Sequence, residues 1–85
     1  MEEEIIEIGY VSHFFSKINV AVIELTLPLS IGNSILVKGP LTDFEQKVES
    51  MQIDRKEILR AEGGRSVGLK FLQFAREKDV VYKIL

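Results

Sequence analysis

Hydrophobic and polar residues alternate over several short stretches of this chain, and such alternation indicates β-strands. Residues 6–13 alternate in this way, and residues 20–25 are rich in β-branched residues, which favour strands. The same criteria predict further strands over residues 34–38, 44–53, 66–71 and 80–84. Turn residues or breaks in the pattern predict connections over residues 16–19, 26–33, 39–43 and 73–79. Many short strands at regular spacing are typical of a β-barrel or a β-sandwich.

Residues 54–63 carry two conflicting signals. Asp54 and Glu57 have the spacing of a helix capping box, and Gly63 stands where a helix would end. A helix of that length is only marginally stable without packing, however. The same segment also suits a turn that is followed by a short strand over residues 58–61. The local residues leave both interpretations open.

Length and composition set limits on the class of protein. A chain of 85 residues suits one domain, which we expect to span residues 1–85. The absence of cysteine excludes disulfides and thiolate chemistry, and with a single histidine we predict no metal site. No apolar run is long enough to cross a bilayer, so we expect no membrane partner.

The first residues are acidic, whereas a signal peptide would begin with basic ones. We therefore expect a complete, cytoplasmic protein, in which Glu2 to Glu4 form a solvated end.

Charge is distributed unevenly along the chain, although the net charge is only −2. Most acidic residues come early: Glu2, Glu3, Glu4, Glu7, Glu24, Asp43, Glu45 and Glu49. Most basic residues come late: Arg55, Lys56, Arg60, Arg65, Lys70, Arg76, Lys78 and Lys83. This distribution is compatible with a basic face in the second half, and the alternative is a mixed, solvated surface.

The order of several short motifs resembles one known family. The segments are Gly9-Tyr10-Val11, Val20-Ala21-Val22, Ile31-Gly32-Asn33-Ser34-Ile35, Lys47-Val48-Glu49-Ser50-Met51-Gln52, Ala61-Glu62-Gly63-Gly64-Arg65-Ser66-Val67-Gly68-Leu69 and Asp79-Val80-Val81-Tyr82-Lys83. Over nearly the whole chain, this order resembles the second domain of elongation factor Tu and related translation GTPases. The resemblance implies an all-β fold, a six- to seven-stranded antiparallel, Greek-key-like β-barrel. It also implies a turn and a strand, not a helix, within residues 54–63.

The chain departs from that family at several positions. Asn33 follows Gly32 and Arg65 follows Gly64, where the family often has an acidic residue. Lys78 stands where a glycine is common before the last strand. The chain has no Gly-x-x-x-x-Gly-Lys-Ser/Thr phosphate loop, so we expect neither GTPase activity nor nucleotide binding.

The resemblance also implies candidate nucleic-acid contacts. In elongation factor Tu this domain helps to hold the aminoacylated end of tRNA. The resemblance implies that Gln52 and Arg55 occupy the matching positions in this chain. Arg55 keeps the basic residue type and suits a phosphate or a base, whereas Gln52 replaces an acidic residue. Lys56, Arg65 and Lys70 would supply further basic contacts. The alternative is that these are ordinary polar surface residues.

A second candidate site lies at residues 13–17, where aromatic residues stand beside a cation and suit base stacking. In a strand, Phe14 and Phe15 point to opposite sides, so we expect one of them to lie in the core. His13 has no partner at the spacing of a known motif, which argues against a role as a ligand or a base.

The leading functional prediction is a non-catalytic binding module that is associated with translation and contacts tRNA, ribosomal RNA or a translation component. No nucleophile motif and no acid–base pair spacing is present, so we predict neither an enzyme nor a cofactor. The alternative is a protein-interaction or accessory barrel that binds a larger enzyme in trans. Similar barrels occur at the ends of larger enzymes, including collagenase-like peptidases.

Overall fold

The computed structural model describes residues 4–85, and within them it contains ten β-strands and no helix. The strands are β1 (Ile5–Phe15), β2 (Val20–Leu25), β3 (Leu29–Ser30), β4 (Ser34–Gly39), β5 (Thr42–Lys47), β6 (Met51–Ile53), β7 (Lys56–Ile58), β8 (Arg60–Ala61), β9 (Ser66–Lys70) and β10 (Val80–Ile84). The all-β prediction is confirmed, although the strands are more numerous than expected and β1 is longer than the strand predicted over residues 6–13. The solvated end expected for Glu2 to Glu4 lies outside the described residues, except for Glu4, which is exposed.

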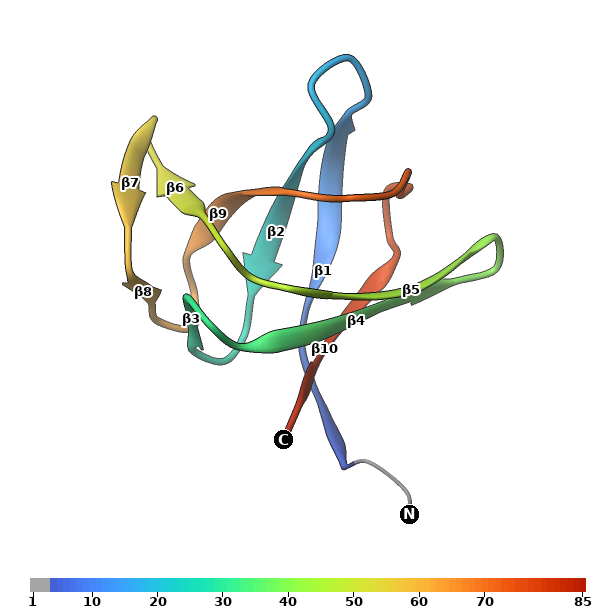
Figure 1. Cartoon of the computed structure of the whole chain (residues 1–85), viewed down its shortest axis with the longest axis horizontal. Coiled ribbons are helices and arrows are strands. Elements are labelled where there is room, and N and C mark those ends of the chain that lie inside the picture. Colours follow the sequence, from blue (N-terminus) through green and yellow to red (C-terminus); the bar gives the residue numbers. More distant parts are fainter. Residues whose placement is uncertain (1–3) are drawn as a thin grey trace.

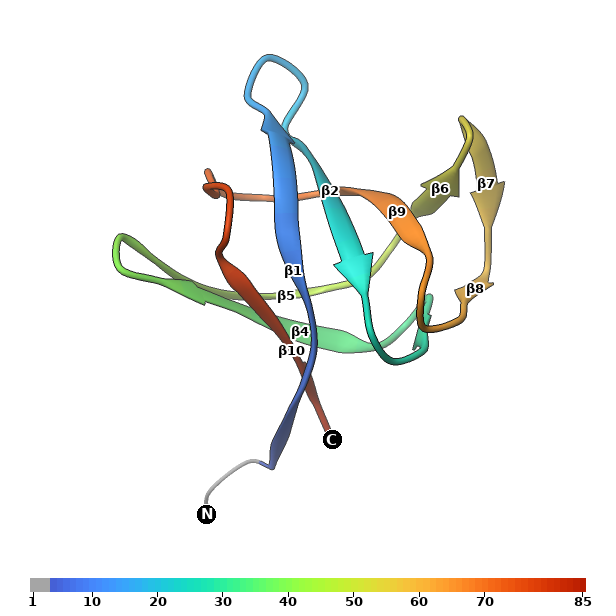
Figure 2. The ribbon, with the colours of Figure 1, turned by 180° about the vertical axis from the view of Figure 1, so that it is seen from behind.

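Eight strands form one antiparallel sheet in the order β5-β4-β10-β1-β2-β9-β6-β7, and β3 pairs separately with β8. The sheet is strongly twisted, so that β4 and β5 face β1 and β2 across the interior (Figures 1 and 2). The β1–β2 turn projects from one end of the molecule, and the paired residues Ile5 and Ile84 lie toward the other. The specific elongation factor Tu arrangement is therefore not established by this sheet order.

The side chains that point to the interior of the twisted sheet form one hydrophobic core. Burial alternates residue by residue along β2 and β5, and the sequence pattern predicts this alternation for the β5 residues from Phe44 onward. The largest fully buried side chain is Phe71, which lies just after β9. Every buried side-chain nitrogen or oxygen within residues 4–85 has a hydrogen-bond partner.

The long strand predicted over residues 44–53 is wrong, because the chain changes partners at Val48. The Val48 amide donates to the Asn33 carbonyl at 2.8 Å, and the Val48 carbonyl accepts from the Gly32 amide at 2.8 Å. The residues before this point pair with β4, and those after it pair with β7 and β9. Val48 is buried in phase with the residues before it, and the alternation shifts by one position after the adjacent polar residues Glu49 and Ser50, so that Met51 is the next buried residue.

Residues 54–63 contain no helix, so the predicted turn is confirmed, whereas the strand predicted over residues 58–61 is divided at Leu59 into the end of β7 and the short strand β8. Asp54 and Arg55 have φ angles of 52° and 66°, which is the left-handed pair that a type I′ hairpin turn requires. This turn joins β6 to β7, and β8 lies within the strand predicted over residues 58–61. A left-handed residue directly after Asp54 cannot begin a right-handed helix, which removes the capping-box interpretation.

The side chain of Gln46 connects the edge strand β5 to the segment after β9. Its Nε2 atom donates to the Lys70 carbonyl at 2.9 Å, and its Oε1 atom accepts from the Leu72 amide at 2.8 Å. The primary amide thus takes the place of a backbone peptide group on a neighbouring strand. Because Gln46 itself is buried, both hydrogen bonds are shielded from solvent.

We expect Gln46→Glu to lower the free energy of unfolding by about 1–3 kcal/mol, since the second carboxylate oxygen would face the Lys70 carbonyl without a hydrogen to share. Urea denaturation of the variant measures the change. Gln52→Glu is the matched control, because Gln52 is exposed. If Gln46→Glu and Gln52→Glu lowered the free energy of unfolding by the same small amount, the Gln46 amide would not join these segments.

Candidate functional site

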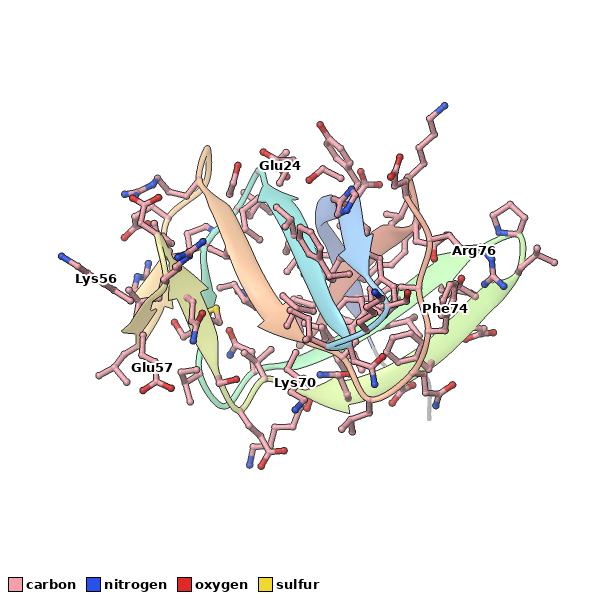
Figure 3. All side chains as sticks on the ribbon, turned by 90° about the horizontal axis from the view of Figure 1, so that it is seen from above. Glu24, Lys56, Glu57, Lys70, Phe74 and Arg76 are labelled. Carbon is pink, nitrogen blue, oxygen red and sulfur yellow. The ribbon has the colours of Figure 1, made fainter. Side chains whose placement is uncertain are left out.

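The five residues predicted to contact nucleic acid are all exposed, but the fold does not gather them into one site: Gln52 and Lys70 line one cleft, whereas Arg65 lies beside the other end of β9. Arg55 lies in the β6–β7 turn with Lys56 next to it, and Gln52 is on β6. Arg65 and Lys70 lie at opposite ends of β9, about 16 Å apart along the strand. Figure 3 shows Lys56 and Lys70 pointing away from the molecule in different directions.

Acidic residues are interspersed among these cations. Asp54 and Glu57 flank the two basic residues of the β6–β7 turn. Nearby, the guanidinium of Arg60 forms an exposed ion pair with Glu62 at 3.2 Å. This part of the surface therefore has the mixed charge that the alternative interpretation described. A role for the five residues in binding RNA stays a prediction.

An exposed aromatic cluster forms at the β1–β2 turn, and we call it the hairpin patch. It consists of Phe14, Phe15, Ile18 and Phe74, and three of these side chains are about half exposed: Phe15 at 47%, Ile18 at 60% and Phe74 at 54%. Two adjoining grooves of about 330 and 280 Å³ share Phe14 and Ser16 in their linings. The patch is thus one continuous apolar surface that joins the hairpin to the loop after β9.

Aromatic contacts fix the geometry of the hairpin patch. The Phe14 ring meets Phe74 edge-on, with centroids 5.0 Å apart, and lies 6.2 Å from the buried Phe71. The amide of Phe71 donates to the Asn19 carbonyl at 2.8 Å, which ties the loop to the β1–β2 turn. The expectation that one of the adjacent phenylalanines is a core residue is confirmed, since Phe14 packs against the core and Phe15 does not.

Charged groups border the hairpin patch. The Arg76 guanidinium lies 5.0 Å from the centroid of the Phe74 ring, a cation–π arrangement, as the labelled side chains in Figure 3 show. It also donates to the Leu41 carbonyl at 3.2 Å. His13 Nδ1 lies 3.4 Å from a carboxylate oxygen of Glu77. The sequence indicated the hairpin residues, but it missed Phe74 and Arg76 because only the fold brings that loop beside the hairpin.

A second polar arrangement lies at Glu24, outside the hairpin patch. The Glu24 carboxylate accepts hydrogen bonds from the hydroxyls of Ser12 and Ser66, which joins three adjacent strands. Both hydroxyls donate to the same carboxylate and no imidazole takes part, so the arrangement suits a structural role better than nucleophilic attack. Residues 4–85 contain no group of three or more acidic or histidine side chains placed to hold one metal ion.

A narrower cleft lies beside the β6–β7 hairpin. It has a volume of about 150 Å³ and is lined by Ile31, Glu49, Ser50, Met51, Glu57, Ile58 and Leu59. Its two carboxylates favour a cation, so its chemistry is opposite to that of the hairpin patch.

Within residues 4–85 there is also no helix with the length and apolar character that a membrane span needs.

The fold and its surface define a small, all-β antiparallel domain with an exposed aromatic patch. No protein-family model matches the chain. It is 46% identical over 78 residues to an uncharacterized protease of Methanocaldococcus jannaschii, an alignment that covers 91% of this chain and 19% of that protein. The chain therefore spans about a fifth of the length of the curated relative that it matches.

Solved structures share the fold. The C-terminal domain of a U32 peptidase described as putative, from Geobacillus thermoleovorans, superposes with a TM-score of 0.84 over 89% of both chains, at 18% sequence identity. The selenomethionine variant of that domain gives a TM-score of 0.84 over 89% of this chain and 96% of its own, at 16% identity.

These similarities correct the family resemblance inferred from sequence. The relative is described as a protease and the solved domains as part of a U32 peptidase, so the identification with translation factors and with elongation factor Tu is wrong. RNA and ribosomal partners receive no support from them. The motifs misled because corner glycines such as Gly32 and Gly64, with φ angles of 94° and 86°, mark tight turns in any small antiparallel fold.

Proposed function

We propose that this chain is a non-catalytic accessory domain of a U32-type peptidase, which it contacts through a protein–protein interface. The observation that carries the proposal is the superposition on the C-terminal domain of such a peptidase, over 89% of both chains. The 46% identity to a segment of the Methanocaldococcus jannaschii protease supports it independently from sequence. The proposal applies both to a domain joined to the peptidase and to one that binds it in trans.

The chemistry of the described surface supports an accessory role. The serine hydroxyls at Glu24 have no imidazole beside them, and the single histidine of the chain lies next to Glu77. The hairpin patch, in contrast, combines exposed phenylalanines with an arginine, and these residue types are enriched in protein interfaces. A binding role therefore accounts for more of the surface than a catalytic role does.

Binding in trans tests the proposal. The probe is the Methanocaldococcus jannaschii protease from which the 78 matched residues have been deleted, titrated with the 85-residue chain. A partner present at one hundred times its dissociation constant stabilises the folded protein by about 2.7 kcal/mol, so we expect a clear rise in its Tm. The chain alone should cleave no peptide substrate. An unchanged Tm with no measurable binding would refute binding in trans, whereas the joined form is tested by a covalent chimera, in which the linker raises the effective concentration of the domain.

A further inference from the structure

We infer that the hairpin patch is the surface through which this domain binds the rest of the peptidase, and that it takes an apolar side chain flanked by a carboxylate. The inference rests on the proposed function and adds to it the location of the interface and the chemistry of the partner. Its first basis is exposure: Phe15, Ile18 and Phe74 present a continuous apolar surface to water. Covering such a surface is favourable because it removes apolar area from water.

The second basis is rigidity. Phe14 lies between the core residue Phe71 and the exposed Phe74, and the Arg76 guanidinium lies over the Phe74 ring. The Phe71–Asn19 hydrogen bond fixes the loop to the hairpin. A surface whose side chains are already held in place loses little conformational entropy when a partner binds. The part of the hairpin patch formed by Phe14 and Phe74 is therefore preorganised as a binding surface.

The third basis is local charge. Although the chain has a net charge of −2, the hairpin patch is bordered by Lys17 and Arg76, and Lys70 pairs with Val20 at the base of the hairpin. The carboxylate at this border belongs to Glu77, and it lies against His13. The patch is thus locally basic on an acidic chain. Electrostatic complementarity then selects a partner segment that carries Asp or Glu beside its apolar residue.

Three single variants and one control test the inference against the segment-deleted protease. Phe15→Ser and Phe74→Ser remove apolar area, and Lys17→Glu reverses a border charge without touching a hydrogen bond of the fold. Leu59→Ser is the control, since Leu59 is also exposed but lines the acidic cleft at the other hairpin. Circular dichroism first verifies that each variant is folded.

We expect each phenylalanine variant to raise Kd at least about tenfold, and Leu59→Ser to leave it unchanged. Lys17→Glu should raise Kd severalfold and reduce its dependence on salt between about 50 and 300 mM. If the wild type binds and the Phe variants bind equally well, or if only Leu59→Ser weakens binding, the hairpin patch is not the interface, while the proposed function stands. If the wild type does not bind, this inference and the in-trans form of the proposed function both fail.

Self-association is the remaining outcome to distinguish. Size-exclusion chromatography with light scattering on the 85-residue chain measures its oligomeric state. A dimer that Phe74→Ser converts to a monomer would show that a second copy covers the hairpin patch, and it would overturn the assignment to the peptidase. If the wild-type chain and the Phe74→Ser variant are both monomers, the inference is supported, because the hairpin patch then stays free for the larger partner.

Discussion

Replacing Phe71 with alanine is expected to lower the free energy of unfolding by about 3–5 kcal/mol, the usual cost of removing a buried aromatic ring. Phe71 is 1% exposed, and its ring meets Phe44 edge-on with centroids 5.4 Å apart. It also supports Phe14, so the variant leaves a cavity between β5 and the hairpin. For a domain of this size the total stability is on the order of 5–10 kcal/mol, so a large fraction would be lost.

The matched control for this prediction is Phe74→Ala. Phe74 makes an edge contact with the same neighbour, Phe14, but it is 54% exposed. We expect Phe74→Ala to lower the free energy of unfolding by less than about 1 kcal/mol, since most of the Phe74 surface is already in water. Urea denaturation measures both values. Equal losses for the two variants would mean that the core does not extend beneath the hairpin patch as described.

The second large effect is expected for Gly9→Ala, which should cost about 3 kcal/mol through overpacking. A Cβ atom at Gly9 would overlap the carbonyl oxygen of Glu24 and lie 3.2 Å from the Cα of Leu25. Both contacts are backbone atoms of β2, which cannot move away without breaking the ladder between β1 and β2. The thermal midpoint of the variant should fall by more than about 10 °C.

Gly68→Ala provides the control for Gly9→Ala, because it is the same substitution in β9, the strand on the other side of β2. A Cβ atom at Gly68 would lie 3.7 Å from Cγ1 of Val20 and 3.8 Å from the carbonyl oxygen of Gln52, which are ordinary contacts. We expect no loss of stability, and a gain of up to about 1 kcal/mol, since alanine restricts the unfolded chain more than glycine does. A loss at Gly68 similar to that at Gly9 would contradict the strand packing described.

Much of the secondary structure could be predicted from the sequence, and the reasons are local. The strand predicted over residues 20–25 coincides with β2, and the one predicted over residues 80–84 coincides with β10. In both, β-branched residues coincide with burial in a sheet. The adjacent polar residues Glu49 and Ser50 interrupt the alternation, but the partners of Val48 could not be predicted, because its hydrogen bonds go to the turn at Gly32 and Asn33, which are distant in the sequence.

The candidate site was only partly predictable for a similar reason. Phe14 and Phe15 stand out in the sequence because they are adjacent aromatic residues beside a lysine. Phe74 and Arg76 complete the hairpin patch from a connecting loop, and no periodicity marks them. Lys78 is an instructive case, since it stands where the resembling family has a glycine, and its φ angle of 76° is one that glycine adopts freely. A glycine pattern thus reports turn geometry and not the identity of a partner.

The central claim is that this domain is equivalent to the accessory domain of a U32-type peptidase. The most direct measurement is the Tm of a chimera in which this chain replaces the 78 matched residues of the Methanocaldococcus jannaschii protease. We expect the chimera to unfold at nearly the Tm of the intact protease and well above that of the segment-deleted protein. A chimera in which the rest of the protease unfolds at the Tm of the deletion would contradict it.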